Sequence, residues 1–145
     1  MSRLLLTIST VLLFGCTMVA TKETDLFEIY KELAKEVSNS SVVANREKYF
    51  SNFYLSDVTE NNEKSTFVLK IPGQIRELIS HFQAIQSKEI ACLTINGLDV
   101  EGYPASINIE YTYENGAWLV NYMHLNLLES QSSFTNEAVC PRELG

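Results

Sequence analysis

The sequence lacks most of the patterns by which catalytic and cofactor-binding proteins are recognised. It has only two histidines and three cysteines among 145 residues. Neither Cys92 nor Cys140 has a His or Cys nearby at the spacing of a zinc site. No glycine-rich phosphate loop, HExxH pattern or Ser-His-Asp order is present. We therefore expect no metal and no cofactor, and no motif supports an enzymatic activity.

The sequence also lacks an excess of positive charge. It contains 18 acidic and 11 basic residues, which give a formal net charge of −7. No basic patch with interleaved aromatic residues occurs, so nucleic acid is not an expected partner. An acidic domain is repelled by anionic lipid headgroups, and its charge therefore does not hold it on a membrane.

A long apolar run is missing as well. The apolar residues 4–14 are fewer than the about 20 that a membrane-spanning helix needs. They follow Arg3 and end at Gly15 and Cys16. A basic start, a short apolar run and a small residue at the end are typical of a removable export signal.

The residues Leu13-Phe14-Gly15-Cys16 resemble the lipobox of bacterial lipoproteins, although Phe14 stands where a smaller residue is usual. The resemblance implies that residues 1–15 are a signal peptide and that Cys16 carries acyl chains such as palmitate. Two alternatives remain open. One is an ordinary signal cut after Ala20, and the other is an uncleaved anchor.

Two or more acyl chains anchor a protein stably, so the resemblance implies a membrane lipoprotein. Thr17 is not the Asp that retains such proteins in the inner membrane, which favours the outer membrane, facing the periplasm. Loss of Arg3 with the signal changes the formal net charge from −7 to −8. Residues 17–24 form a tether of at most about 28 Å.

Cys92 and Cys140 remain once Cys16 is lipidated. In an exported protein two such cysteines are most simply a disulfide bond. Two free thiols and a metal or redox site are the alternatives. A disulfide would tie the polar carboxyl-terminal residues 130–145 back to the fold.

Residues 25–145 are expected to form one α+β domain. Asp25 predicts the start of a helix that ends before residues 38–41, and a second helix is expected over residues 42–55. Residues 65–71 predict a short strand. Five apolar residues between 74 and 87 lie on one stripe, which predicts a third helix.

From residue 89 onward the apolar period becomes two, which predicts strands over 90–100, 105–114 and 117–128. Asn115-Gly116 predicts a two-residue hairpin turn. Such a turn pairs Tyr113 with Trp118 and Tyr111 with Val120. The same register pairs Ile109 with Tyr122 and Ile107 with His124, all on one face of the sheet.

This element order resembles the NTF2-like cone fold and some cystatin-like lipoproteins. The resemblance implies a curved antiparallel sheet packed against about three helices, with an apolar pocket between them. The pocket serves as an enzyme site in some members and as a ligand or partner site in others.

Five residues of the predicted aromatic face are the candidate pocket: Tyr111, Tyr113, Trp118, Tyr122 and His124. Plain core packing is the alternative. His124 alone has catalytic potential there, while His81 is expected to flank the third helix at the surface. We expect a lipid-anchored, non-catalytic module that binds an envelope protein or an apolar ligand. The alternative is a small hydrolase or isomerase that uses His124.

Overall fold

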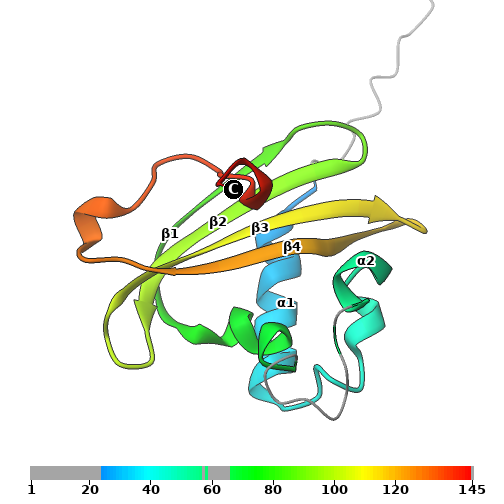
Figure 1. Ribbon diagram of the computed structural model, residues 1–145, viewed down its shortest axis with the longest axis horizontal. Coiled ribbons are helices and arrows are strands. Elements are labelled where there is room, and N and C mark those ends of the chain that lie inside the picture. Colours follow the sequence, from blue (N-terminus) through cyan, green and yellow to red (C-terminus); the bar gives the residue numbers. More distant parts are fainter. Residues whose placement is uncertain (1–23, 57, 59–65, 145) are drawn as a thin grey trace, which may run out of the picture.

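The computed structural model of the chain describes residues 24–56, 58 and 66–144. They form an α+β fold built on a four-stranded antiparallel sheet (Figure 1). The strands follow one another across the sheet in sequence order: β1 (Ile75–Ile85), β2 (Ile90–Asp99), β3 (Pro104–Glu114) and β4 (Ala117–Leu127). The predicted signal peptide, Cys16 and residues 17–23 of the tether lie outside the described residues. Within the described part, no helix is both long and apolar enough to cross a bilayer.

The helix α1 (Leu26–Ser38) begins and ends where the sequence predicts. The carboxylate of Asp25 accepts hydrogen bonds from the backbone N–H groups of Phe27 at 3.1 Å and Glu28 at 3.2 Å. These bonds satisfy two donors that the first turn of a helix leaves without partners. The apolar stripe of α1 faces the sheet, and Leu33 is completely buried.

The predicted helix over residues 42–55 is wrong. The structure has only the short helices η1 (Arg46–Lys48) and α2 (Asn52–Leu55) there. Between them, Phe50 lies beside Val120 in a parallel bridge. The outer edge of β4 would otherwise expose unpaired backbone groups, and pairing with this segment satisfies some of them.

The predicted strand over 65–71 and the predicted helix over 74–87 are also wrong. The first is helical over its described residues 66–71, which include the start of η2 (Val68–Gln74). The second is strand β1. Two bulges in β1, at Arg76 and Ile79, explain the misleading pattern. Each bulge adds one residue, so side chains on the same face recur every three residues instead of every two.

The pairing of β1 with β2 shows this three-residue spacing. Ile75, Leu78 and His81 lie opposite Asp99, Gly97 and Ile95, which alternate regularly along β2. A Cβ atom on Gly97 would lie 2.3 Å from the backbone oxygen of Glu77. Gly97 therefore permits the close approach of the bulged strand, and β2 itself continues through the predicted bend at residues 96–97.

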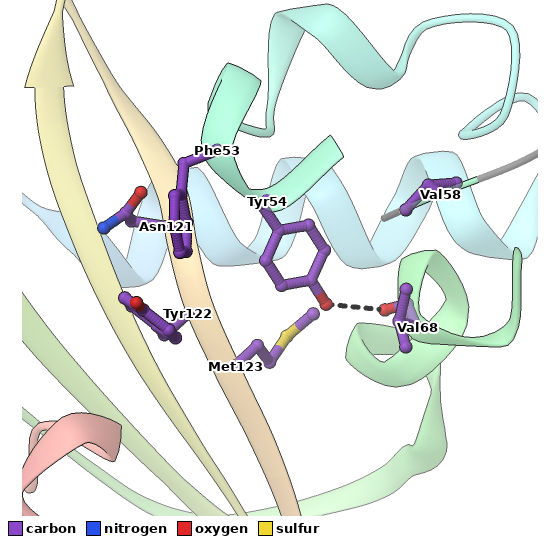
Figure 2. Close-up of a pocket in the computed structure, with 7 residues that line it drawn as sticks. All are labelled: Phe53, Tyr54, Val58, Val68, Asn121, Tyr122 and Met123. Carbon is purple, nitrogen blue, oxygen red and sulfur yellow. Dashed lines mark hydrogen bonds between the residues drawn. The ribbon is translucent and has the colours of Figure 1, made fainter. Parts of the chain in front are cut away.

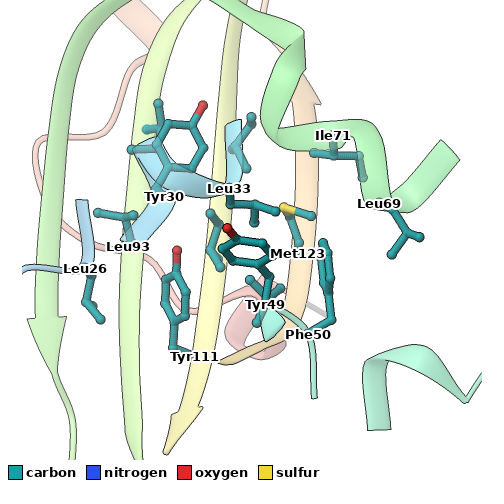
Figure 3. Packing of buried hydrophobic residues seen from close by; sticks show 14 of the residues in the cluster. Leu26, Tyr30, Leu33, Tyr49, Phe50, Leu69, Ile71, Leu93, Tyr111 and Met123 are labelled. Carbon is teal, nitrogen blue, oxygen red and sulfur yellow. The ribbon is translucent and has the colours of Figure 1, made fainter. Parts of the chain in front are cut away.

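The hydrophobic core lies between one face of the sheet and the helices below it in the view of Figure 1. Figure 3 shows side chains from α1, η2 and strands β2 to β4 meeting there. The completely buried members include Leu26, Leu33, Leu69, Leu93, Ile95, Ile107, Ile109, Tyr111 and Val120. Burial of each such side chain is favourable by about 1.5–3 kcal/mol, so this face supplies much of the folding free energy.

The opposite face of the sheet is covered by the carboxyl-terminal segment, residues 128–144, which lies above the strands in Figure 1. This segment contains the short helices η3 (Gln131–Ser133) and η4 (Pro141–Leu144). A disulfide joins Cys140 to Cys92 of β2, with the two Cα atoms 5.3 Å apart. The predicted disulfide is thus confirmed.

Candidate functional site

The β3–β4 hairpin follows the predicted register close to its turn. Asn115 and Gly116 both have positive φ, 52° and 83°. Two consecutive residues with positive φ form a type I′ turn, whose twist matches that of the flanking strands. Tyr113 lies opposite Trp118, and Tyr111 lies opposite Val120, as predicted.

Beyond Tyr111 the predicted register is wrong. Asn121 is an extra residue in β4, so Tyr122 lies opposite Glu110 and His124 lies opposite Asn108. A single added residue turns every later side chain to the other face. Tyr122 and His124 therefore do not share the face of Tyr111.

The structure divides the predicted aromatic pocket into three places. Tyr111 is completely buried in the core. Tyr113 and Trp118 pack together at the turn end of the hairpin, with ring centroids 5.2 Å apart. Tyr122 and His124 belong to the opposite face of the sheet. Core packing is thus the correct description for Tyr111, and in part for Trp118, which packs against the edge of the core.

His124 is exposed and lines a depression of about 460 Å³, whose wall includes polar residues such as Asn108 and apolar residues such as Leu127 and Val139. No carboxylate within residues 24–56, 58 and 66–144 forms an ion pair or a hydrogen bond with this histidine. His81 is exposed, as predicted, and stacks on Phe27 of α1 with ring centroids 3.8 Å apart.

A pocket of about 240 Å³ lies between α2, η2 and strand β4 (Figure 2). Its apolar wall is made by Phe53, Tyr54, Val58, Val68 and Met123, and its β4 side by Asn121 and Tyr122. In Figure 2 the ring of Phe53 lies over that of Tyr122, and their centroids are 5.1 Å apart. Phe53 remains 58% exposed, although an apolar residue of this size is usually buried.

Ser51 fixes the position of α2 beside this pocket. Its backbone N–H donates to the carbonyl of Val120 at 2.9 Å, which attaches the segment to the edge of β4. Its hydroxyl accepts from the backbone N–H of Tyr54 at 3.1 Å and so caps α2. The hydroxyl of Tyr54 in turn donates to the carbonyl of Val68 at 3.2 Å. Burial raises the pKa of Tyr54, which keeps this donor protonated.

The bulged residue Asn121 connects the pocket to the carboxyl-terminal segment. Its side-chain oxygen accepts from the Ser51 hydroxyl at 2.9 Å, and its side-chain amide donates to Glu110 at 3.3 Å. Glu110 is only 2% exposed. A buried carboxylate requires charged or hydrogen-bonding partners, and Asn121 supplies one of them.

Arg142 supplies the others. Its Nε donates to one oxygen of Glu110 at 2.8 Å, and its Nη2 lies 2.5 Å from the other oxygen. Two parallel contacts of this kind are the strongest form of a carboxylate–guanidinium pair. The bond to Glu110 raises the pKa of Arg142. The same guanidinium lies 5.0 Å from the ring of Tyr122, so Arg142, Tyr122 and Phe53 form a continuous series of contacts.

Sequence reasoning did not single out Phe53, Glu110, Asn121 or Arg142 as site residues. Glu110 was recognisable as a member of a polar strand face, but its partner lies 32 residues further along the chain. Arg142 follows Cys140 by two residues, and the disulfide joins Cys140 to β2, the strand beside Glu110. Only the three-dimensional structure shows that these residues meet.

Within the described residues, no group of three or more His, Cys, Asp or Glu side chains is placed to hold a metal ion. Comparison of the chain with protein-family models finds no match, and a search of the curated proteins finds none either. The site is therefore interpreted from its own geometry.

Proposed function

We propose that this chain is a lipid-anchored lipoprotein of the bacterial cell envelope whose folded domain is a non-catalytic binding module. The proposal for the anchor is supported by the residues Leu13-Phe14-Gly15-Cys16, which end a short apolar run. Cys16 would carry the acyl chains after removal of residues 1–15. Thr17 favours the outer membrane, with the domain in the periplasm.

The proposed relationship to the NTF2-like cone or to cystatin-like lipoproteins concerns the arrangement of elements. A long helix, α1, precedes four antiparallel strands that are adjacent in sequence order. Bulges in β1 and β4 favour a bent sheet, since a bulge increases local twist. These features support a sheet that wraps around α1.

The observation that carries the binding proposal is the exposed ring of Phe53 against the half-buried ring of Tyr122, beside the pocket at α2. Phe53 and Tyr122 form the rim, and Met123 and Val68 form the apolar floor. Small-molecule sites commonly enclose about 300–1,000 Å³. A pocket of about 240 Å³ instead suits one bulky apolar side chain of an envelope protein. Aromatic residues at such a position are favoured as interaction hot spots.

The test uses the full-length protein expressed in a bacterial envelope and crosslinked in place. We expect Phe53→Ser to abolish a defined crosslinked species, because it removes the exposed half of the aromatic rim. Phe67→Ser is the matched control, since Phe67 is 48% exposed and does not line this pocket. Equal crosslinking by both variants would contradict the proposed site.

The anchor is tested separately by Cys16→Ser. This variant cannot receive the thioether-linked lipid and should move from the membrane to the soluble fraction. Retention of the variant in the membrane, at the level of the unaltered protein, would contradict anchoring through Cys16.

A further inference from the structure

The described chain begins at Thr24, and Thr24 lies at a defined end of the sheet. Gln83, near the end of β1, donates from its side-chain amide to the carbonyl of Thr24 at 3.1 Å. Its side-chain oxygen accepts from the backbone N–H of Leu26 at 2.9 Å. The start of α1 is thus attached beside the β1–β2 turn. The β3–β4 hairpin turns at the same end, on the right of Figure 1.

This end of the molecule carries an exposed aromatic side chain, Tyr113, beside a half-buried one, Trp118. Tyr113 is 46% exposed and packs against the half-buried Trp118. Thr24 and Tyr49 line the same shallow depression, which has a volume of about 390 Å³. Tyr and Trp are favoured at membrane–water interfaces because each has an apolar ring and a polar tip.

The charges at this depression differ from the charge of the whole domain. One cation, Lys48, and one acid, Glu32, line it. The Nζ of Lys48 donates to the hydroxyl of Tyr49 at 2.9 Å and lies over its ring. Within the depression these two charges offset each other, while Glu89 and Glu114 lie at the flanking turns. Long cationic side chains can also reach polar headgroups while their methylene stems cover apolar surface.

The spacing from Cys16 to Thr24 restricts how far this end can move from an anchored lipid. Eight residues reach at most about 28 Å when fully extended, and less in any other conformation. The end of the sheet that carries Tyr113 and Trp118 is also the end from which this short segment leaves. A lipid on Cys16 therefore holds this end, and not the β2–β3 turn, next to the bilayer.

We propose that this end of the sheet, defined by Lys48, Tyr113 and Trp118, rests on the headgroups of the membrane that holds Cys16. The occupant is the bilayer surface itself. The inference depends on the proposed lipid anchor, because the aromatic contacts act only at the high local concentration that the anchor provides.

Trp118 is the only tryptophan of the chain, so its fluorescence reports on this surface directly. The experiment uses the lipidated protein, purified from a full-length expression and reconstituted into phosphatidylethanolamine–phosphatidylglycerol vesicles. We expect a blue shift of the Trp118 emission relative to detergent solution. We also expect quenching by phospholipids brominated near the headgroup end of the acyl chain.

Two tyrosine variants provide the matched comparison. Tyr113→Ser should reduce the quenching of Trp118, because it removes the neighbouring interfacial ring. Tyr103→Ser should leave the quenching unchanged, since Tyr103 is 62% exposed but lies at the β2–β3 turn, the opposite end of the sheet.

Flotation of the same vesicles separates the two proposals. Protein that floats with the lipid but shows no quenching of Trp118 would overturn the proposed surface while leaving the anchor in place. Protein that carries no acyl group and does not float would overturn both. Equal quenching in the Tyr113→Ser and Tyr103→Ser variants would also overturn the proposed surface.

Discussion

The sheet face that packs against α1 and the sheet face under the carboxyl-terminal segment are covered by different kinds of contact. The first face is apolar: Ile107 and Tyr111 of the sheet pack there against Leu33 of α1. The second contains buried polar groups, and a segment without a long helix covers it. Hydrophobic burial therefore stabilises one face of the sheet. Hydrogen bonds, an ion pair and a disulfide stabilise the other face.

The polar face is held by a series of specific partners. Val139 donates from its backbone N–H to the hydroxyl of Thr94 at 2.9 Å. Asn96 donates to the carbonyl of Thr135, also at 2.9 Å. The hydroxyl of Thr94 bonds Asn108 at 2.8 Å, so the buried side chains of this face are connected to one another. A buried polar group that loses its hydrogen-bond partner is costly. The carboxyl-terminal segment is therefore more sensitive than the apolar core to the loss of a single partner.

The largest effect should follow removal of the disulfide on the polar face. The variant Cys92→Ala/Cys140→Ala loses a crosslink that spans a sequence separation of 48 residues. The chain-entropy model gives a loss of about 4 kcal/mol in the free energy of unfolding for a loop of this size. Urea unfolding followed by circular dichroism measures it. A loss below about 1 kcal/mol would show that directed hydrogen bonds alone hold the segment.

The next largest effect should come from the apolar face. Leu33→Ala removes a completely buried side chain of α1 and should lower the free energy of unfolding by about 3 kcal/mol. Leu127→Ala is the matched control at a position that is 69% exposed, where a change within about 0.5 kcal/mol is expected. Similar losses in both variants, measured by urea unfolding, would contradict the assignment of the core to this face.

Arg142→Met tests the ion pair of the polar face and should cost about 2 kcal/mol, because it leaves the buried carboxylate of Glu110 without its cation. The double variant Glu110→Gln/Arg142→Met removes the unpaired charge as well. It should regain much of the lost stability, since replacement of both partners is better tolerated than removal of one. A double variant less stable than Arg142→Met, by urea unfolding, would contradict this interpretation.

The smallest effect should come from Glu36, which belongs to neither face. Hydrogen bonds from Ser41 and then Asn45 hold the pKa of its carboxyl below the usual value. A lowered pKa in the folded state gives a stabilisation that is present above the unfolded pKa and is lost as the pH falls through the folded pKa. Glu36→Gln should therefore lower the urea midpoint slightly at neutral pH and not in acid.

Ser41→Ala provides the control for this prediction, because it removes the principal donor to Glu36 and keeps the carboxylate. It should give a similar small decrease at neutral pH. A decrease of the same size at all pH values in either variant would show that ionisation of Glu36 is not the cause.

Where local chemistry decides the structure, the sequence was sufficient to predict it. The cap at Asp25 and the turn at Asn115-Gly116 depend on residues only a few positions apart. The three later strands were also predicted nearly to their ends, because their apolar period is close to two and turn residues separate them. The disulfide between Cys92 and Cys140 followed from their being the two cysteines left after Cys16.

The rest could not be predicted because bulges change the period of a strand. Arg76 and Ile79 give β1 a three-residue spacing that is the expected pattern of a helix. Asn121 shifts the end of β4 by one residue, which moved Tyr122 and His124 out of the predicted pocket. A bulge is stabilised by distant partners, such as Glu110 and Ser51 for Asn121, and leaves no local signal in the sequence.

Mass spectrometry of the amino-terminal peptide tests the central proposal, lipid anchoring at Cys16, most directly. The protein is expressed with residues 1–145 in a bacterial envelope and extracted with detergent. We predict a mature chain that begins at Cys16 and carries the mass of a diacylglyceryl group and a third acyl chain. A chain that begins at Thr21 without acyl groups, or one that retains Met1 and unmodified Cys16, would contradict the proposal.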